Sequence, residues 1–465
     1  MVYSISLGDF SYIVNRTAYD RAELEKLIGK VCALNKIDPS LYEKYSVKRG
    51  LRNADGTGVV AGITNICNVH GYVIDEGEKK AIPGELFYRG ININEIISET
   101  TAKSRFGFEE TAYLLLFGEL PTKAEFAEFD ELLTDFRVLP SGFSEDMIFK
   151  APSRNIMNKM VRSVSALYSY DDDPEDMSVE KELLRAISII ARLPSIMVDS
   201  YQIKKRIFDN DSLFMHPSIP EESVAESILS TLRADRNYTK EEALLLDLCL
   251  ILHAEHGGGN NSTFVCRTLT SSGTDAYSAY GGAIGSLKGP RHGGANAKVM
   301  AQTDEFREKT GGDYSDSAVS DMIVKVLKKE AGDGSGLIYG MGHAVYTVSD
   351  PRAKALKENA LKIAEGTEYE REFCLLDAIE RLTPGLFAEI RGADKAICAN
   401  VDMYSGLVYK MLGVPPELYT PLFAVSRITG WAAHRIEELL TGKRIIRPAY
   451  KAIAKLRSYT PVDER

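Results

Sequence analysis

The chain has 465 residues, of which 44% are hydrophobic and 26% charged, and it carries a formal net charge of -10. These proportions are typical of a folded globular protein and too apolar for a disordered one. The acidic balance, with no block of lysines and arginines to offset it, makes nucleic acid an unexpected partner.

The sequence also disfavours a membrane protein. The longest apolar run, at 243–252, is too short to cross a bilayer and contains Asp247. The first residues include Asp9, Asp20 and Glu23 and have no apolar stretch like that of a signal peptide. We therefore expect a cytoplasmic protein.

The six cysteines lie at wide spacings without a CxxC pair: Cys32, Cys67, Cys249, Cys266, Cys374 and Cys398. This pattern favours reduced thiols in the core over disulfides or a zinc site. His253 and His256 beside Glu255 are only a weak metal signal, because the HExxH pattern of metalloproteases is absent. We expect no metal.

Along the chain, strand patterns are confined mainly to residues 57–91, where VVAGITNICNVHGYVID and ELFYRGI alternate weakly around turn residues. Helical periodicity dominates from residue 95 onward and begins with FEETAYLLL at 108–116. Loops are indicated at 169–178, which is acidic and broken by proline, and at the glycine-rich 331–336. The fold class is mainly α, with a small β element near the N-terminus.

Two later helices have clear boundaries. Thr239 and Glu242 form a capping box, and that helix must end near the glycines at 257–259, which places His253 and His256 in or just beyond its last turn. A second helix is predicted from Pro421 to Leu440, with Thr420 as its cap and Gly442 beyond its end.

Three of the seven histidines lie in windows dense in glycine: His256 in HAEHGGGN, His292 in KGPRHGGAN and His343 in GMGHAV. Glycines around a titratable group usually indicate that the backbone approaches another group closely, because a residue without a Cβ leaves that room. A small ligand is the simplest candidate. Pro290 suits a first helical turn, which would put His292 at a helix N-terminus and keep it neutral, able to polarise a carbonyl or stabilise an enolate. An incidental histidine at a helix start is an equal alternative.

Charged groups elsewhere point to an anion. Asp350 can cap a helix that starts at Pro351, and Arg352 in its first turn makes sense if it binds an anion, although it could be a solvated arginine held by Asp350. Arg427 lies in a helix that is apolar around it and needs either an internal carboxylate or a ligand. Asp402 in NVDMYSG is a helix cap or a general base.

Motifs of three large enzyme classes are absent. The sequence contains no GxxxxGK[ST] and no GxGxxG between a strand and a helix, so nucleotide binding of those kinds has no support. It contains no GxSxG either, which leaves a serine hydrolase unsupported.

Taken in order, these windows resemble the citrate synthase family, together with LFYRGININEI, FEETAYLLLFGELP, MVRSVSALYSYD, ARLPSIM, LFAVSRITGW and RIIRP. The resemblance runs from about Gly50 onward. It implies a two-domain helical fold, with a large domain at 46–290 and 403–465 and a small domain at 291–402 that closes over substrate. Residues 1–45 form an N-terminal segment with no counterpart and no assigned role.

The resemblance also implies a role for each candidate residue. Asp402 matches the base that removes a proton from the methyl group of acetyl-CoA, His292 matches the donor to the thioester oxygen, and His343 matches the group that polarises the oxaloacetate ketone. The oxaloacetate site would comprise His256, Asn260, Arg352, Phe423, Arg427 and Arg447, the last reaching across from the other subunit of a homodimer.

Binding of CoA is assigned to Gly340, Met341, Gly342, Ala344, Lys354 and Lys357. The two lysines are included because Thr347 stands where some family members have a basic residue for the CoA phosphates. A second departure is Glu255, where the family usually has aspartate, and a third is KAPSRNIMNKM, which lacks the family's His-Pro-Met.

The function implied is that of an acyltransferase that converts an acyl group to an alkyl group. It would condense acetyl-CoA with oxaloacetate and water to citrate and CoA, with acetyl-CoA as a substrate and no separate cofactor. The nearest alternative is a 2-methylcitrate synthase that uses propionyl-CoA. A helical scaffold without turnover is disfavoured because the base, both polarising histidines and all three arginines are present.

Overall fold

The computed structural model describes residues 21–53, 57–76, 78–392 and 396–465. The chain divides into two compact units, Met1–Val59 with Pro448–Arg465, and Val60–Arg447. The N-terminal segment at 1–45 belongs to the first unit, and its residues 1–20 lie outside the described residues. The division of the chain into large and small domains remains a prediction.

The first unit contains two helices that sequence periodicity did not indicate, α1 (Arg21–Leu34) and α2 (Ser40–Lys44). Short 3-10 turns follow at Arg49–Leu51 and, near the other end of the chain, at Val462–Glu464. The two segments of this unit meet where the Lys451 ammonium lies 5.4 Å from the centre of the Tyr45 ring.

The second unit begins with a small antiparallel sheet, as the strand patterns predicted. Strand β1 (Cys67–Asp75) pairs with β2 (Glu78–Tyr88), and β2 pairs with the short β3 (Ile91–Asn92). Gly84 in β2 touches the chain just before Asp350, because a Cβ there would lie 2.2 Å from the Ser349 carbonyl oxygen. Tyr88 at the end of β2 donates its hydroxyl to the Ile251 carbonyl at 3.0 Å. The sheet therefore holds two segments that carry candidate site residues.

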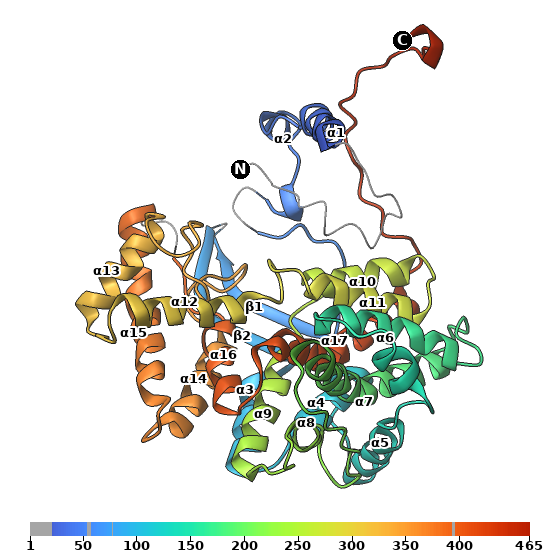
Figure 1. Ribbon diagram of the computed structural model, residues 1–465, viewed down its shortest axis with the longest axis vertical. Helices are drawn as coiled ribbons and strands as arrows, with labels where there is room; N and C mark the ends of the chain where they lie inside the picture. The colour runs from blue at the N-terminus through green and yellow to red at the C-terminus, as the bar shows by residue number, and fades with distance from the viewer. Residues whose placement is uncertain (1–20, 54–56, 77, 393–395) are drawn as a thin grey trace. The chain divides into compact units, whose positions relative to one another are not determined.

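The rest of the second unit is helical, which confirms the mainly α fold class (Figure 1). Its helices are α3 (Ile93–Ala102), α4 (Phe108–Phe117), α5 (Lys123–Phe136), α6 (Ile156–Ala166), α7 (Val179–Lys204), α8 (Val224–Leu232), α9 (Lys240–His253), α10 (Asn261–Ser271), α11 (Ala276–Leu287), α12 (Ala295–Lys309), α13 (Asp316–Leu327), α14 (Pro351–Ala364), α15 (Glu370–Arg391), α16 (Asp402–Met411) and α17 (Tyr419–Thr441). Short 3-10 or π-helical turns lie at Ser144–Phe149, Leu167–Tyr170, Lys205–Asp209 and Pro416–Leu418. None of the helices in the described ranges is long and apolar enough to cross a membrane.

Two helix boundaries can be compared with their predictions. Helix α9 is capped by Thr239 and Glu242 as predicted, and it ends at His253, a few residues before the glycines that were expected to end it. Helix α17 starts at Tyr419, two residues earlier than predicted, and Thr420 does not cap it. Its hydroxyl donates instead to the Gly293 carbonyl at 2.8 Å. Pro421 is tolerated inside the first turn because no backbone N–H is needed there.

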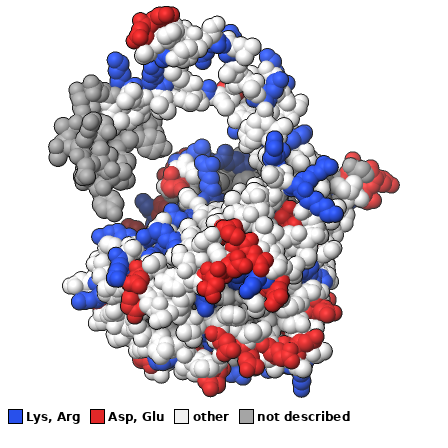
Figure 2. Space-filling model, turned by 90° about the vertical axis from the view of Figure 1, so that its right-hand side faces the viewer, with Lys and Arg blue, Asp and Glu red and all other residues white. Residues whose placement is uncertain are grey.

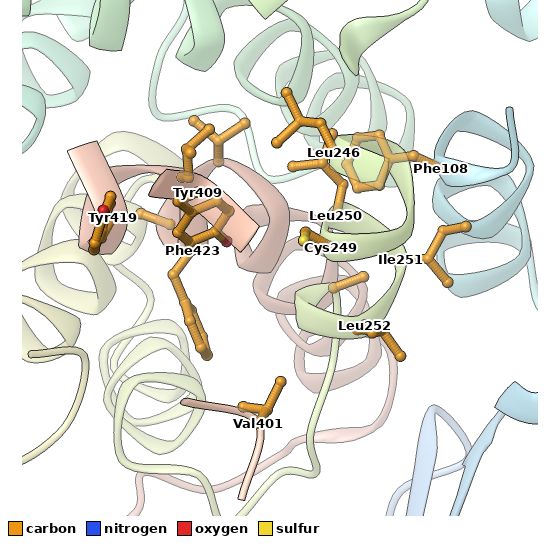
Figure 3. Close-up of a cluster of buried hydrophobic side chains, with 14 of the residues drawn as sticks. Phe108, Leu246, Cys249, Leu250, Ile251, Leu252, Val401, Tyr409, Tyr419 and Phe423 are labelled. Atoms are coloured by element: carbon orange, nitrogen blue, oxygen red, sulfur yellow. The ribbon is translucent and has the colours of Figure 1, made fainter. Parts of the chain in front are cut away.

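Helix α17 is the centre of the core. It packs against α4, α7, α9, α10 and α11, and nearly all of its residues from Tyr419 to Arg435 are buried. Figure 3 shows one apolar cluster beside it, in which Leu246, Cys249 and Leu250 of α9 face Tyr409 of α16 and Phe423 of α17. This cluster joins the three helices that carry His253, Asp402 and Arg427.

The cysteine prediction was half right. All six thiols are free, as expected, but only Cys249, Cys266 and Cys398 are buried. Cys32 and Cys374 are exposed and Cys67 is half-buried, so the term core thiol fits three of the six.

On the lower part of the face drawn in Figure 2, acidic side chains form clusters with basic side chains between them, in keeping with the net charge of -10.

A buried ion pair fastens α17 to α7. Arg435 donates from Nε and Nη2 to both carboxylate oxygens of Glu182, at 2.7 and 2.9 Å, and both side chains are fully buried. The guanidinium also donates to the Thr270 hydroxyl at 3.1 Å and the Thr274 carbonyl at 3.0 Å. Every nitrogen of this guanidinium therefore has a partner within the chain.

Glu182→Ala is expected to lower the free energy of unfolding by about 3–5 kcal/mol, because it leaves the buried guanidinium of Arg435 without its carboxylate. Urea denaturation followed by circular dichroism measures the loss. Glu180→Ala, on the exposed face of the same helix, is the matched control and should change stability by less than about 0.5 kcal/mol. Equal losses in the two variants would contradict a structural role for the pair.

Candidate active site

Helix α9 ends in the first candidate segment. His253 is its last residue, fully buried, with its ring stacked on Phe423 at 4.2 Å between centroids. His256 follows at 8% exposure, and Gly257 after it has a φ of 86°, which makes the sharp turn that a side chain with a Cβ would strain. Burial and the charge of Arg352 drive the pKa of His256 well below its usual value, so the ring is neutral.

His343 meets His256 across a ring contact of 5.0 Å and stacks on Tyr346 at 4.6 Å. Its Nδ1 accepts hydrogen bonds from the backbone N–H groups of Val345, at 3.1 Å, and Tyr346, at 3.0 Å. A backbone N–H can only donate, so Nδ1 carries no proton. In the neutral ring the proton is on Nε2, which makes Nε2 the hydrogen-bond donor.

Arg352 lies at the start of α14, whose cap is Asp350, as the sequence predicted. The Asp350 carboxylate accepts from the Arg352 backbone N–H at 3.0 Å and from Nε and Nη2 at 3.1 and 2.7 Å. Arg352 is only 3% exposed, so the alternative of a solvated arginine is wrong. The pKa of Arg352 is raised, because the carboxylate of Asp350 outweighs burial.

Arg427 in α17 is fully buried and only partly satisfied. Its Nε donates to the His253 carbonyl at 2.5 Å, and its guanidinium lies 4.7 Å from the centre of the Phe423 ring. Within the described part of the chain, Nη1 and Nη2 have no hydrogen-bond partner. Burial lowers the pKa of Arg427 to about 10, so the group remains a cation at neutral pH. Its two Nη nitrogens are therefore available as hydrogen-bond donors.

Asp402 is the first residue of α16 and follows the N-cap position, so it is not the helix cap that the sequence left open. Its backbone N–H donates to the Asn400 side chain at 3.0 Å. Burial raises the pKa of Asp402 to about 6, while the charges of Arg352 and Arg427 oppose the rise and that of Asp350 adds to it. This value is suited to a general base near neutral pH.

His292 lies in a turn before α12, three residues short of its first residue, so the prediction of Pro290 in a helical first turn was wrong. The helix starts at Ala295 after Gly294. The neutral state has another cause: burial, and then the charge of Arg427, lower the pKa of His292 to about 4. Its Nε2 accepts from the Ser262 backbone N–H at 3.3 Å, which leaves Nδ1 as the donor.

Of the remaining candidates, Asn260 and the segment at 340–342 contact residues of the site, whereas Arg447 does not. Asn260 joins the site through Ser262, whose hydroxyl oxygen lies 2.9 Å from the Asn260 side-chain oxygen. Gly340 and Gly342 flank Met341 with positive φ angles and hydrogen-bond Asn400 and Cys398, which lie just before Asp402. Arg447 is exposed beyond α17 and is not brought to these groups within the single chain.

The two lysines assigned to CoA phosphates line a 450 Å³ cavity with Asp350 and Cys398. Lys357 is bound to Asp377 at 2.6 Å and to Glu380 at 2.7 Å, so its charge is already matched. Ala344 is exposed in the same segment as His343. No cluster of three or more metal-ligating side chains occurs among the residues with described positions.

Comparison with known proteins gives one consistent answer. The family model described as citrate synthase, C-terminal domain, matches residues 53–449. A citrate synthase from Haloferax volcanii is 34% identical over 82% of this chain and 93% of its own length. A 2-methylcitrate synthase from Shewanella oneidensis is 30% identical over 78% of this chain and 87% of its own.

The chain belongs to the citrate synthase family. Its fold agrees with that of the Thermoplasma acidophilum citrate synthase, solved as a ternary complex with carboxymethyl coenzyme A and oxaloacetate, at a TM-score of 0.72 and 28% identity over 90% of this chain and 99% of that one. The protein is therefore an acyltransferase of the citrate synthase type.

Sequence reasoning missed the residues that orient the candidate groups of this citrate synthase family member. Ser262 contacts His292 and accepts from the Trp431 indole at 3.2 Å, and Asn400 contacts Asp402. The Ser262–His292 contact joins positions 30 residues apart, so no local pattern could have revealed it. Asn400 stands two residues before Asp402, and this short spacing is the one local signal available.

His292 is expected to remain neutral down to about pH 5, with its proton on Nδ1, since burial disfavours the cation. Two-dimensional ¹⁵N NMR of histidine-labelled protein reports both ring nitrogens across a pH titration, and His292→Gln assigns the signal. Ser262→Ala should keep the tautomer, because the backbone N–H remains. A His292 signal that titrates near its ordinary pKa of about 6.5 would contradict this account.

Proposed function

We propose that the protein condenses acetyl-CoA with oxaloacetate and water to give citrate and CoA. The proposal is supported above all by the two buried Nη groups of Arg427, which have no partner among the described residues. The charge of Arg352 acts both on Arg427 and on the neutral ring of His256. Two buried guanidinium groups whose charges act on one another suit a dicarboxylate better than any neutral ligand.

Oxaloacetate binding is assigned to His256, Asn260, Arg352, Phe423, Arg427 and, from the other subunit of a homodimer, Arg447. The carboxylates would accept hydrogen bonds from the arginines, and Nε2–H of His343 would donate to the ketone oxygen. Polarising that ketone makes its carbon a better electrophile.

The carbon nucleophile comes from the acyl-CoA. Asp402 removes a proton from the methyl group next to the thioester, and the electron pair moves toward the thioester oxygen. His292 stabilises that oxygen by donating a hydrogen bond from Nδ1 while the negative charge develops on it. A neutral donor suits this step, because the developing enolate oxygen can share its proton.

Bond formation completes the condensation. The enolate carbon attacks the oxaloacetate ketone carbon, and the ketone oxygen takes the proton from His343 to give citryl-CoA. Water then cleaves the thioester, which releases citrate and the CoA thiol. Closure of residues 291–402 over the remaining chain would keep water from the acyl-CoA until the new bond has formed.

The acyl-CoA is proposed to enter beside His292, which borders a 490 Å³ cavity with Asn261, Ser286 and Arg291. Gly340, Met341, Gly342 and Ala344 are assigned to its pantetheine arm. Lys354 is the better phosphate candidate of the two lysines, because Lys357 is already paired with two carboxylates. A cytoplasmic location belongs to the same proposal.

The second candidate function is a 2-methylcitrate synthase, favoured by the relative of that name in Shewanella oneidensis. Propionyl-CoA differs from acetyl-CoA by one methylene, which an apolar pocket discriminates by only about 10–200-fold. Both reactions use the same base, donors and arginines.

Purified protein mixed with oxaloacetate and acetyl-CoA is expected to release CoA thiol, measured with a chromogenic disulfide. Propionyl-CoA tested side by side distinguishes the two functions by the ratio of kcat/KM values. Acyl-CoA without oxaloacetate is the control for plain thioester hydrolysis. Absence of any oxaloacetate-dependent thiol release would contradict the proposed function, whereas a higher kcat/KM with propionyl-CoA would favour the second candidate.

Asp402→Asn is expected to lower kcat by about 10²–10⁴-fold while oxaloacetate still binds, because the amide cannot accept the proton. In the unmodified protein kcat/KM should rise with pH through about 6 and then level, as Asp402 ionises. Burial disfavours the ionised form, so the folded state should lose no stability at pH 7 on this substitution, and thermal denaturation checks that point. Equal loss of oxaloacetate affinity, measured by calorimetry, would argue against a role as base.

A further inference from the structure

Glu255 lies between His253 and His256 but faces away from them, toward α17. Its side chain is fully buried, and Oε1 accepts from the Gly257 backbone N–H at 2.5 Å and from His434 Nε2 at 3.0 Å. The carboxylate therefore closes the turn that follows His256. It also ties this turn to a helix 179 residues further along the chain.

The hydrogen bonds behind Glu255 have a fixed direction. Arg267 Nη1 lies 2.9 Å from His434 Nδ1, and a guanidinium can only donate, so Nδ1 accepts. His434 must then donate from Nε2 to Glu255. Arg267 is itself held by Glu437 at 2.7 Å and Glu438 at 2.8 Å. We call Glu255, His434 and Arg267 the rear relay.

Gly430 makes room for the relay inside α17. A Cβ at this position would lie 2.1 Å from Glu255 Oε2 and 2.5 Å from the Ala254 carbonyl oxygen. Glycine within a helix costs about 0.5–1 kcal/mol relative to alanine, so its place in a buried helix indicates that the space is needed. Arg427 stands three residues earlier on the same helix.

The second carboxylate oxygen of Glu255 has a different task. Oε2 is buried and has no hydrogen-bond partner among the described side and main chains. The charge of Glu255 acts on Arg427 and supports its ionised form against burial. Asp350, by contrast, occupies Nε and Nη2 of Arg352 directly. Glu255 thus balances the charge of Arg427 without occupying its Nη donors.

We propose that Glu255 is a positioning residue for oxaloacetate, in two ways: its hydrogen bonds to Gly257 and His434 fix the turn that presents His256, and its charge balances that of Arg427 while leaving both Nη groups available to the substrate. This inference rests on the proposed function, and it assigns a role to a position outside the proposed contact set.

Two substitutions separate the two roles. Glu255→Gln keeps the size and an oxygen for Gly257 and His434 but removes the charge, whereas Glu255→Ala removes both. In Glu255→Ala, the KM for oxaloacetate should rise by roughly 10- to 100-fold, the loss of hydrogen bonds to a charged group. The kcat at saturating oxaloacetate should fall much less. Glu241→Ala, exposed at the start of α9, is the matched control and should leave both constants unchanged.

Glu255→Gln should behave differently. Without its counter-charge, Arg427 is an unbalanced buried cation until a substrate carboxylate arrives, so oxaloacetate should raise the Tm of Glu255→Gln by more than that of the parent protein. Glu255→Ala also loses the hydrogen bonds that fix the turn presenting His256, so its oxaloacetate-dependent rise in Tm should be smaller than in the parent. Identical responses of the two variants would overturn the division of roles, and parental KM values in both would overturn the proposal.

His434→Ala tests the rear relay as a unit. It should raise the KM for oxaloacetate by part of the Glu255→Ala effect, and the double variant should add little, because the two residues act together. Fully additive effects would contradict coupling. The parent protein is measured first: failure to bind or turn over oxaloacetate would count against the proposed function, whereas normal turnover with insensitive variants would count only against Glu255.

Discussion

Helix α17 carries three basic side chains, Arg427, His434 and Arg435, into the interior, and each needs a partner from another element because an unpaired buried charge is costly. Glu182 of α7, the Thr270 hydroxyl at the end of α10 and the Thr274 carbonyl before α11 satisfy Arg435 completely. The charge of Arg427 is balanced by Glu255, while none of the residues with described positions accepts a hydrogen bond from its Nη groups. The same helix thus contains a structural guanidinium and one prepared for a ligand, and the difference lies in what the surrounding elements supply. The packing of α9, α10 and α7 around α17 follows from that matching.

Backbone N–H groups decide what the two catalytic candidates His292 and His343 can donate. His343 accepts at Nδ1 from Val345 and Tyr346, and His292 accepts at Nε2 from Ser262, so opposite ring nitrogens are left with the proton. Side chains could rotate away, but amides of a packed backbone cannot, and the tautomers are therefore built into the fold. This gives two neutral donors from the same residue type. The glycines around them serve the close turns rather than the chemistry itself.

Local patterns predicted much of this arrangement. The capping box at Thr239 and the Asp350 cap before Arg352 both depend on neighbours in sequence, and both are confirmed. The position of His292 was predicted wrongly, because a proline is compatible with a turn as well as with a helical start. The link from Glu255 to His434 spans 179 positions and could not be read from spacing. Only the order of the motifs, through the family resemblance, brought the distant candidates together before the structure did.

Charge balance connects binding to catalysis in the proposed function. Arg352 and Arg427 hold the pKa of Asp402 lower than burial alone would set it. A bound dicarboxylate would neutralise those two cations, and their pull on Asp402 would weaken in a site of low dielectric. The pKa of the base would then rise, and with it the ability to take a proton from a weakly acidic thioester methyl group. The arginines that bind one substrate therefore also adjust the base for the other, so that Asp402 reaches its full basicity when the ketone acceptor is already in place.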